Sequence, residues 1–255
     1  MKQTKVISVV NQKGGVGKTT TAINIASFLS ERNIKTLLID TDPQANATSG
    51  VGLQSEKIRE NLYHLLVNNE DIKRVIYPSP FPNLHVIPAS RELAGAEVEM
   101  VPLVSRETLL KERISVLEGC YEYVIIDCPP SLGLLTLNSL VASDKVIIPV
   151  QCEYFALEGV SSLIDTVYLV KENFNPNLEI AGIILTMFDK RTALNRQVAL
   201  NAKDFFKDLV FNTVVPRNIR LTEAPSHGLP IALYHPDSAG ALAYSELTQE
   251  VMARV

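Results

Sequence analysis

Residues 11–20, NQKGGVGKTT, bring glycines, two lysines and two threonines together between an apolar run, KVISVV, and a helix-like run, KTTTAINIA. The glycines allow successive backbone N–H groups to turn inward around phosphate oxygens. The helix N-terminus directs partial positive charge to the same point. Lys18 would reach the terminal phosphates there, and the Thr19 hydroxyl would bind Mg²⁺. The stretch therefore predicts a site for a nucleoside triphosphate.

Two features distinguish this loop from the standard phosphate-binding loop. The usual pattern, G-x-x-x-x-G-K-[ST], requires a glycine where this chain has Gln12. The loop also carries a second lysine, Lys13, although a single cradle needs only Lys18. A second buried ammonium group would add like-charge repulsion, which is relieved if Lys13 points toward phosphates held by another subunit. The alternative is that Lys13 is a solvated loop lysine.

Carboxylates that could orient water and hold the water shell of a metal follow two other apolar runs. TLLID ends in Asp40 and is followed by Asp42, whereas YVIID ends in Asp127, the pattern of a Walker B strand. Ligands of open parallel sheets lie beyond the carboxyl ends of the strands, so these side chains are expected to face the glycine loop. Because Asp42 precedes Pro43, it is alternatively a turn-forming residue.

The elements that must position these residues alternate along the chain. Val- and Ile-rich runs predict strands buried on both faces of a parallel sheet, at residues 5–10, 35–40, 84–89, 123–128, 145–150, 180–187 and 210–216. Intervening amphipathic stretches predict helices, and residues 238–254 predict a closing helix. This alternation implies an α/β fold with a doubly wound, mostly parallel sheet flanked by helices. Since no Pro-, Gly- and Ser-rich linker is evident, we expect a single domain over residues 1–255.

The composition, 46% apolar and 20% charged residues, is that of an ordinary globular protein. No run approaches the ~20 apolar residues of a membrane span, and the apolar run near the start is too short for a signal peptide. Cys120, Cys128 and Cys152 form no CxxC pair, so we expect them to be reduced and buried, as in a cytoplasmic protein.

The net charge is −4, so any binding to nucleic acid must come from a local patch. Residues 186–220 carry seven basic and three acidic side chains, whereas the rest of the chain carries a net charge of −8. Such a segment, without a helix-turn-helix or zinc module, would contact backbone phosphates without sequence preference. A solvated basic helix face is the alternative. Phe205 and Phe206 lie within the predicted helix and are expected in the core.

The motif K-G-G-V-G-K-T resembles the signature of the deviant Walker A ATPases, a branch of the P-loop NTPases that includes ParA/Soj partition proteins, MinD and the nitrogenase iron protein. DTDPQANATSG, PVQCEYFALEGV and VVPRNIRLTEAPSHGLPI resemble ParA/Soj segments, so the similarity runs along the whole chain. It implies ATP and Mg²⁺ as ligands, and it implies that Lys13 reaches across a nucleotide-sandwich dimer. The nucleotide phosphates would be held by Lys13, Gly14, Gly15, Val16, Gly17, Lys18, Thr19 and Thr20.

The resemblance also implies further roles. Asp42 would position the attacking water, with Lys13 and Lys18 as the other catalytic residues, and the metal would be supported by Thr19, Asp40 and Asp127. Residues after the last predicted strand approach the adenine in relatives, which implies Pro216 and Asn218; a loop proline and a helix-capping asparagine are the alternative. Relatives contact DNA through segments similar to DKRTALNR and PRNIRLTEAP, which implies DNA-binding roles for Arg191 and Arg220 and, more weakly, for Lys203 and Lys207.

The implied function is that of an ATP-driven partition protein. An ATP-bound homodimer would bind DNA without sequence preference, and a ParB/Spo0J-like centromere-binding partner would stimulate hydrolysis and release. The alternative is a MinD-like spatial regulator of cell division, which would need a basic amphipathic C-terminal helix; LAYSELTQEVMARV carries one arginine and two glutamates. An iron–sulfur reductase would need two suitably placed cysteines per chain. The expected location is therefore cytoplasmic and nucleoid-associated, with no membrane partner.

Overall fold

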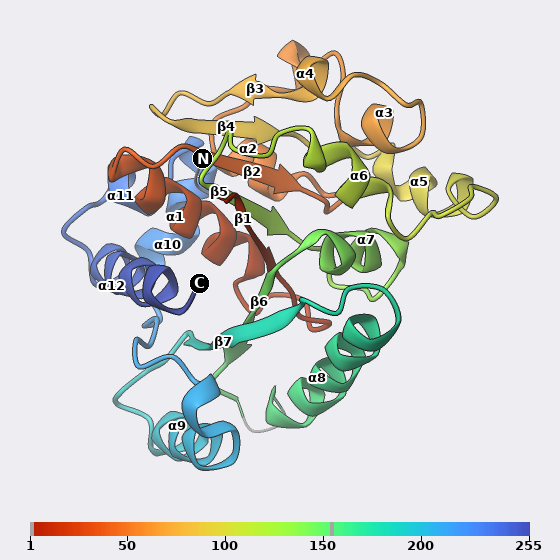
Figure 1. Cartoon of the computed structure of the whole chain (residues 1–255). Coiled ribbons are helices and arrows are strands. Elements are labelled where there is room, and N and C mark those ends of the chain that lie inside the picture. Colours follow the sequence, from red (N-terminus) through yellow and green to blue (C-terminus); the bar gives the residue numbers. More distant parts are fainter. Residues whose placement is uncertain (1–2, 154–155) are drawn as a thin grey trace.

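A computed structural model of the chain describes residues 3–153 and 156–255 (Figure 1). These residues form a seven-stranded sheet with the order β3-β4-β2-β5-β1-β6-β7. Neighbouring strands are parallel, except that β3 runs antiparallel to β4. The predicted α/β class with a mostly parallel sheet is confirmed. The strands are β1 (Lys5–Val9), β2 (Thr36–Asp40), β3 (Tyr77–Pro78), β4 (Leu84–Ile87), β5 (Tyr123–Asp127), β6 (Lys145–Gln151) and β7 (Glu179–Thr186).

Helices flank the sheet on both faces. In Figure 1, α1 and α10 to α12 lie on one side of it, α6 to α8 lie on the other, and α9 lies beyond the β7 edge. Within the described residues, no helix is long and apolar enough to cross a bilayer. The α-helices are α1 (Lys18–Glu31), α2 (Asn46–Gly50), α3 (Leu62–Leu66), α4 (Ile72–Val75), α5 (Leu93–Glu99), α6 (Leu109–Ser115), α7 (Leu134–Ala142), α8 (Ala156–Asn173), α9 (Ala193–Phe206), α10 (Ile219–Glu223), α11 (Ile231–Tyr234) and α12 (Ala239–Arg254). Single 3-10 turns are η1 (Ser55–Lys57), η2 (Lys207–Leu209) and η3 (Ala224–His227).

Each central strand contributes to two hydrophobic cores, because successive side chains point to opposite faces of the sheet. Ile7 and Ile125 belong to the core that contains residues of α1 and α12. Val6 and Val124 belong to the core that contains residues of α6, α7 and α8. Every residue of β2 and β5 is buried. Burial on both faces explains why these strands read as continuous rather than alternating apolar runs.

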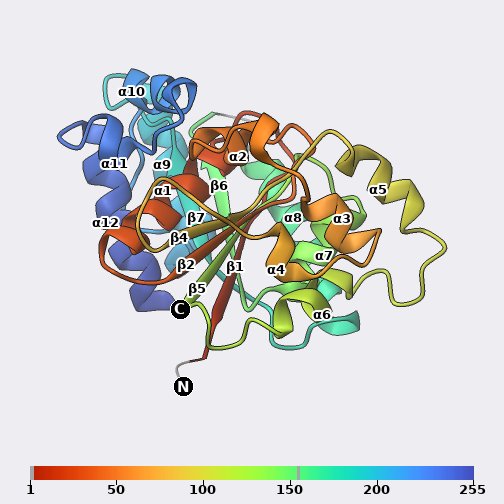
Figure 2. The ribbon, with the colours of Figure 1, turned by 90° about the horizontal axis from the view of Figure 1, so that it is seen from above.

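The sheet is built outward from β1 in two directions. The chain passes from β1 through α1 to β2 on one side, whereas β6 and β7 follow on the other. Open sheets form a ligand crevice beyond the carboxyl ends of the strands at such a reversal of order. The start of β1 and the C-terminal residue lie together at the opposite end (Figure 2), where the Lys5 ammonium group donates to the Val255 carbonyl over 2.5 Å. The glycine loop follows the carboxyl end of β1, so it lies at the crevice and not at the end where Lys5 and Val255 meet.

The predicted strand at residues 210–216 is wrong. This segment makes only isolated bridges to its neighbour, Val210 with Ile183 and Pro216 with Phe188. The amides of Phe211 and Val215 donate to carbonyls of β7, but those of Asn212 and Thr213 donate to the side chain of Glu250 on α12. A Val-rich sequence therefore runs along the sheet without forming a regular ladder. The short edge strand β3 was not predicted.

Two predictions of burial are also wrong. On α9 the buried stripe is Val198, Ala202 and Phe206, at helical spacing, and this places Phe205 on the outer face with 70% exposure. Cys120 lies in the turn that follows α6 and is exposed, whereas Cys128 and Cys152 are buried as expected.

Candidate active site

The glycine loop joins β1 to α1 and has the backbone conformation that glycine permits. Gly15 and Gly17 have φ angles of 73° and 90°, a region that other residues rarely occupy. A Cβ atom at Gly14 or Gly15 would meet no atom within 4 Å, so one side of the loop is open for a ligand. The loop therefore presents its backbone to an unfilled space, as a phosphate cradle requires.

Two side chains hold the loop in place. The Thr186 hydroxyl, at the end of β7, donates to the Val16 carbonyl over 2.8 Å. The amide of Asn11 donates to the Pro149 carbonyl on β6 over 2.7 Å, and its oxygen accepts from the Lys13 amide over 2.9 Å. The Val16 side chain is buried and does not line the cavity. The bonds at the Val16 carbonyl and the Lys13 amide thus hold two peptide groups of the loop in fixed orientations.

The two lysines of the loop lie in different environments. Lys18 lines the cavity, is 6% exposed, and donates from its ammonium group to the Lys13 carbonyl over 3.2 Å. Burial lowers the pKa of Lys18, and the nearby Asp127 acts in the opposite direction. The ammonium group of Lys13 instead lies outside the cavity, 2.9 Å from Glu153. The chain thus uses one lysine inside its own cavity and directs the other outward.

Asp40 and Asp127 are side by side at the carboxyl ends of β2 and β5, where they occupy paired register positions. Asp40 accepts hydrogen bonds from the Asp42 amide and from the amide and hydroxyl of Thr48, over 2.7 to 3.1 Å. Burial raises its pKa to about 6, although these donors act against the shift. Asp127 is fully buried, and both burial and the charge of Asp40 raise its pKa well above the ordinary value.

The donor set fits a Mg²⁺ ion. Neither carboxylate oxygen of Asp127 has a hydrogen-bond partner among the described residues, although the nearby Thr19 side chain acts to lower the Asp127 pKa. An unpaired buried carboxylate is costly, and the waters around Mg²⁺ would satisfy it. Thr19 would ligate the ion, and Asp127 and Asp40 would hold its waters. When bound, the ion supplies neutralisation of the phosphate charge.

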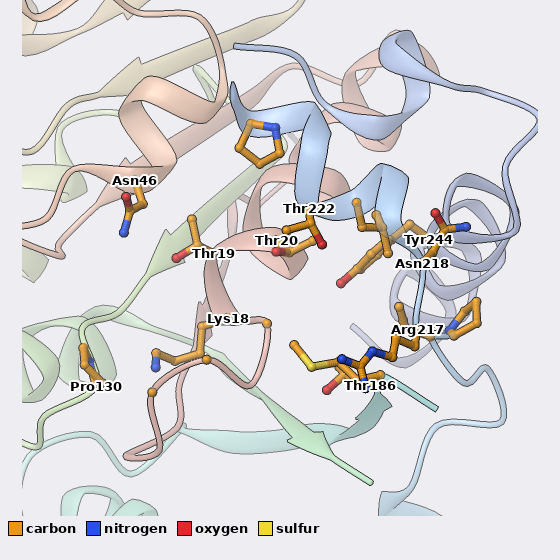
Figure 3. Close-up of a pocket in the computed structure, with 18 of the residues that line it drawn as sticks. Lys18, Thr19, Thr20, Asn46, Pro130, Thr186, Arg217, Asn218, Thr222 and Tyr244 are labelled. Atoms are coloured by element: carbon orange, nitrogen blue, oxygen red, sulfur yellow. The ribbon is translucent and has the colours of Figure 1, made fainter. Parts of the chain in front are cut away.

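The cavity that contains the glycine loop has a volume of about 640 Å³ and continues beyond the loop. Figure 3 shows Lys18 near Pro130 and Asn46 at one end, and Arg217, Asn218 and Tyr244 at the other. Of the residues predicted from the sequence, the cavity is lined by Gly14, Gly15, Gly17, Lys18, Thr19, Thr20, Asp42, Pro216 and Asn218. Asp42 and Asn218 also act locally, since Asp42 accepts from the Gln44 amide and Asn218 caps α10 by accepting from the Arg220 amide.

Several lining residues were not predicted. Thr186 and Met187 come from the end of β7, Arg217 comes from the loop before α10, and Tyr244 comes from α12. The Tyr244 hydroxyl lies 3.0 Å from that of Thr21 on α1, which joins the last helix to the first. Arg217 was counted with the basic segment, but its place is in the cavity wall. Thr186 is the last residue of β7, and its place at the carboxyl end of a strand was the one signal in the sequence that could have indicated it.

The residues predicted to bind DNA lie in two separate places. Lys203 and Lys207 are exposed near the end of α9, and Arg191 is exposed in the turn before that helix. Arg220 lies on α10, which Figure 1 places apart from α9. Both arginines pair with neighbouring carboxylates, Arg191 with Asp189 at 2.7 Å and Arg220 with Glu223 at 2.8 Å.

Comparison with known proteins identifies the family. Residues 4–180 match a family model described as an AAA domain. Over 249 residues the chain is 53% identical to the Sporulation initiation inhibitor protein Soj of Bacillus subtilis, covering 98% of each chain. It is 49% identical to the Chromosome-partitioning ATPase Soj of Treponema pallidum over 250 residues, again covering 98% of each.

Solved structures agree with this assignment. The cobyrinic acid a,c-diamide synthase of Mycobacterium smegmatis, with bound ADP and magnesium, is similar with a TM-score of 0.85 and 35% identity, covering 96% of this chain and 93% of that one. The glycine loop, the paired carboxylates and the cavity lie where such a ligand requires them. The chain therefore belongs to the ParA/Soj family of partitioning ATPases and is itself an ATPase, with ATP as its nucleotide and Mg²⁺ as its metal.

Proposed function

We propose that this chain partitions DNA by an ATP-controlled cycle of pairing and release. Two chains, each a single domain over residues 1–255, pair face to face around two ATP molecules. The observation that carries this proposal is the position of Lys13, whose side chain is 46% exposed and whose ammonium group lies outside the cavity of its own chain. A lysine in that position is available to the nucleotide of a second chain, as an arginine finger is when supplied in trans.

Within each cavity, different residues bind the nucleotide, hold the metal and orient the attacking water. The open backbone of the glycine loop and Lys18 hold the phosphates, and the wall at Pro216 and Asn218 receives the adenine. Asp42 lines the cavity and is the carboxylate proposed to orient the attacking water. Asp40 and Asp127 hold the waters of the metal. Lys13 of the opposite chain adds positive charge where negative charge develops during phosphoryl transfer.

The paired state is the one that binds DNA. The basic residues of a single chain lie in two places, and both arginines, Arg191 and Arg220, are paired with carboxylates, so one chain holds few phosphates through these two and through Lys203 and Lys207. Pairing doubles the number of contacts and makes the second set intramolecular, which multiplies the affinity. A ParB/Spo0J-like partner then stimulates hydrolysis, and the chains separate from each other and from the nucleoid DNA.

The experiment that tests this function is an assay of phosphate release with purified chain and ATP, with and without non-specific duplex DNA and a ParB-like partner. We expect slow release that rises when DNA and the partner are both present. A metabolic kinase would instead transfer phosphate to a small acceptor and would be indifferent to DNA. Release that neither DNA nor partner changes would contradict the proposed function.

A further inference from the structure

Residues Val215 to Asn218 form the wall of the nucleotide cavity that lies farthest from Lys18. They follow residues 208–214, which form no regular strand. Backbone bonds from Val215 to Leu185 and from Phe188 to Val215, over 2.9 and 3.1 Å, hold the wall to the end of β7 and the residues after it. The residues just before the wall receive most of their polar contacts from side chains of the last helix instead. A binding wall outside a ladder needs such support to keep a fixed position.

Glu250 supplies the first part of this support. Its two carboxylate oxygens accept from the amides of Asn212 and Thr213, over 2.8 and 3.0 Å, two residues before Val215. One side chain thus takes two successive donors that a partner strand would otherwise have to take. Although partial burial alone would raise the pKa of Glu250, these amide donors and Arg254 lower it below the ordinary value, so the carboxylate is ionised at neutral pH.

Arg254 supplies the second part, from the next turn of α12. Its guanidinium group donates to Glu250 over 3.0 Å and lies 4.2 Å from the ring centroid of Phe211. It also donates, over 3.1 to 3.4 Å, to the carbonyls of Ala181, Asp208, Leu209 and Val210. These bonds join η2, the start of the segment and β7 through one side chain, which a planar guanidinium fork with five donors can do.

Gly182 makes room for this contact. A Cβ atom built there would lie 2.6 Å from the Phe211 ring, 2.7 Å from the Leu209 carbonyl and 2.8 Å from the Arg254 guanidinium. Two of these neighbours cannot easily move, since one is backbone and the other a buried ring. The close approach of the segment to β7 is thus built into the sheet as well as into the last helix.

We propose that Glu250 and Arg254 are positioning residues for the base-side wall of the ATP cavity. Among the described residues, the hydrogen bonds of these two side chains outside α12 go to Ala181 and to residues 208–213, which lead into the wall at Val215 to Asn218. The same helix lines the cavity itself with Tyr244. This inference rests on the proposal that the adenine lies against Pro216 and Asn218, and it adds what sets the position of that wall.

The test compares ATP with tripolyphosphate, which keeps the phosphates but lacks the base and the ribose. Glu250→Ala leaves two amides without their acceptor, and we expect the KM for ATP to rise about tenfold while kcat stays within about twofold. Calorimetry with Mg²⁺ should show the same loss of affinity for ATP, with the affinity for tripolyphosphate unchanged. Glu250→Gln keeps one strong acceptor oxygen and should restore part of the preference for ATP.

Arg32→Ala is the matched control. Arg32 also ties α12 to a neighbouring element, because its guanidinium donates to the Phe28 carbonyl and to Ser245, but it does not touch residues 208–213. We expect this variant to keep the full preference for ATP. Equal weakening of ATP and tripolyphosphate in Glu250→Ala, or no weakening of either, would overturn the positioning role. If Glu250→Ala does not fold, the ratio of the affinities for ATP and tripolyphosphate in Glu250→Gln tests the positioning role instead.

The two proposals fail differently in this experiment. Wild-type protein that binds ATP and tripolyphosphate equally well would overturn the placement of the base beside Pro216 and Asn218, and the positioning role with it. Wild-type protein that prefers ATP, combined with a Glu250→Ala variant that retains the full preference, would overturn the positioning role alone.

Discussion

The ammonium group of Lys13 lies 2.9 Å from the carboxylate of Glu153 in the same chain. Both side chains are about half exposed, at 46% and 52%, so water screens their attraction. If Lys13 serves the nucleotide of a second chain, it must leave Glu153 to do so. The pair then stabilises the single chain and competes weakly with dimer formation.

Release of Lys13 should therefore strengthen pairing. We expect Glu153→Gln to tighten the ATP-dependent dimer by roughly two- to thirtyfold, the effect of losing two exposed ion pairs, one in each chain. Sedimentation equilibrium with a non-hydrolysable ATP analogue measures this change. Glu179→Gln, which breaks the exposed pair with Lys145 far from the cavity, should leave the dimer constant unchanged. Weaker pairing in Glu153→Gln would show that this carboxylate supports the dimer instead.

The two buried carboxylates should respond differently to loss of charge. Asp40 accepts three hydrogen bonds, so Asp40→Asn should lower the free energy of unfolding of the nucleotide-free protein by about 1–3 kcal/mol. Asp127 accepts none from the described residues and its buried charge is costly, so Asp127→Asn should leave the free energy of unfolding unchanged or raise it, and should still abolish ATP hydrolysis. Urea unfolding without nucleotide measures both variants. A greater loss of stability in Asp127→Asn would contradict the assignment of its oxygens to the waters of the metal.

Arg220 offers a quantitative test of DNA binding. Each phosphate contact contributes about 0.9 to the slope of log affinity against log salt, so Arg220→Ala should reduce that slope by about 2 in a dimer. Pairing with ATP should be unaffected. Arg74→Ala, which removes an exposed arginine from α4, is the control and should keep the wild-type slope. An unchanged slope in Arg220→Ala would exclude this residue from the DNA interface.

The three cysteines should differ in reactivity. Cys120 is exposed, whereas burial raises the pKa of Cys128 to about 12 and that of Cys152 to about 11. The thiolate is the reactive form, so at pH 8 one thiol per chain should react rapidly with a thiol reagent and the other two only after unfolding. Cys120→Ser should remove the rapid phase. A rapid phase that persists in this variant would contradict the burial of the other two.

Local patterns allowed much of the site to be predicted. The glycine loop, Thr19, and the carboxylates at the ends of two apolar runs are recognised by spacing within a few residues, and parallel strands bring their carboxyl ends together. Thr186, Arg217 and Tyr244 could not be found this way. Each belongs to an element far along the chain from the glycine loop, and a single threonine, arginine or tyrosine has no characteristic spacing.

The errors have a common physical cause. The Val-rich run at 210–216 has the composition of a strand, but Glu250 takes two of its amide groups, and this contact is invisible to local propensity. Phe205 is as apolar as Phe206, but successive helical side chains point in different directions, and the narrow buried face of α9 includes only Phe206. Tertiary contacts decided both outcomes.

If ATP joins two chains through Lys13, the mass of the protein in solution must double when ATP binds. Sedimentation of wild-type chain and of Lys13→Ala, each with a non-hydrolysable ATP analogue and with ADP, tests it. We expect wild-type protein with the analogue to sediment at twice the 28.1 kDa mass of the chain, and Lys13→Ala to remain single in every condition. Wild-type protein that stays single with the analogue, or a Lys13→Ala variant that pairs as well as wild type, would contradict the claim.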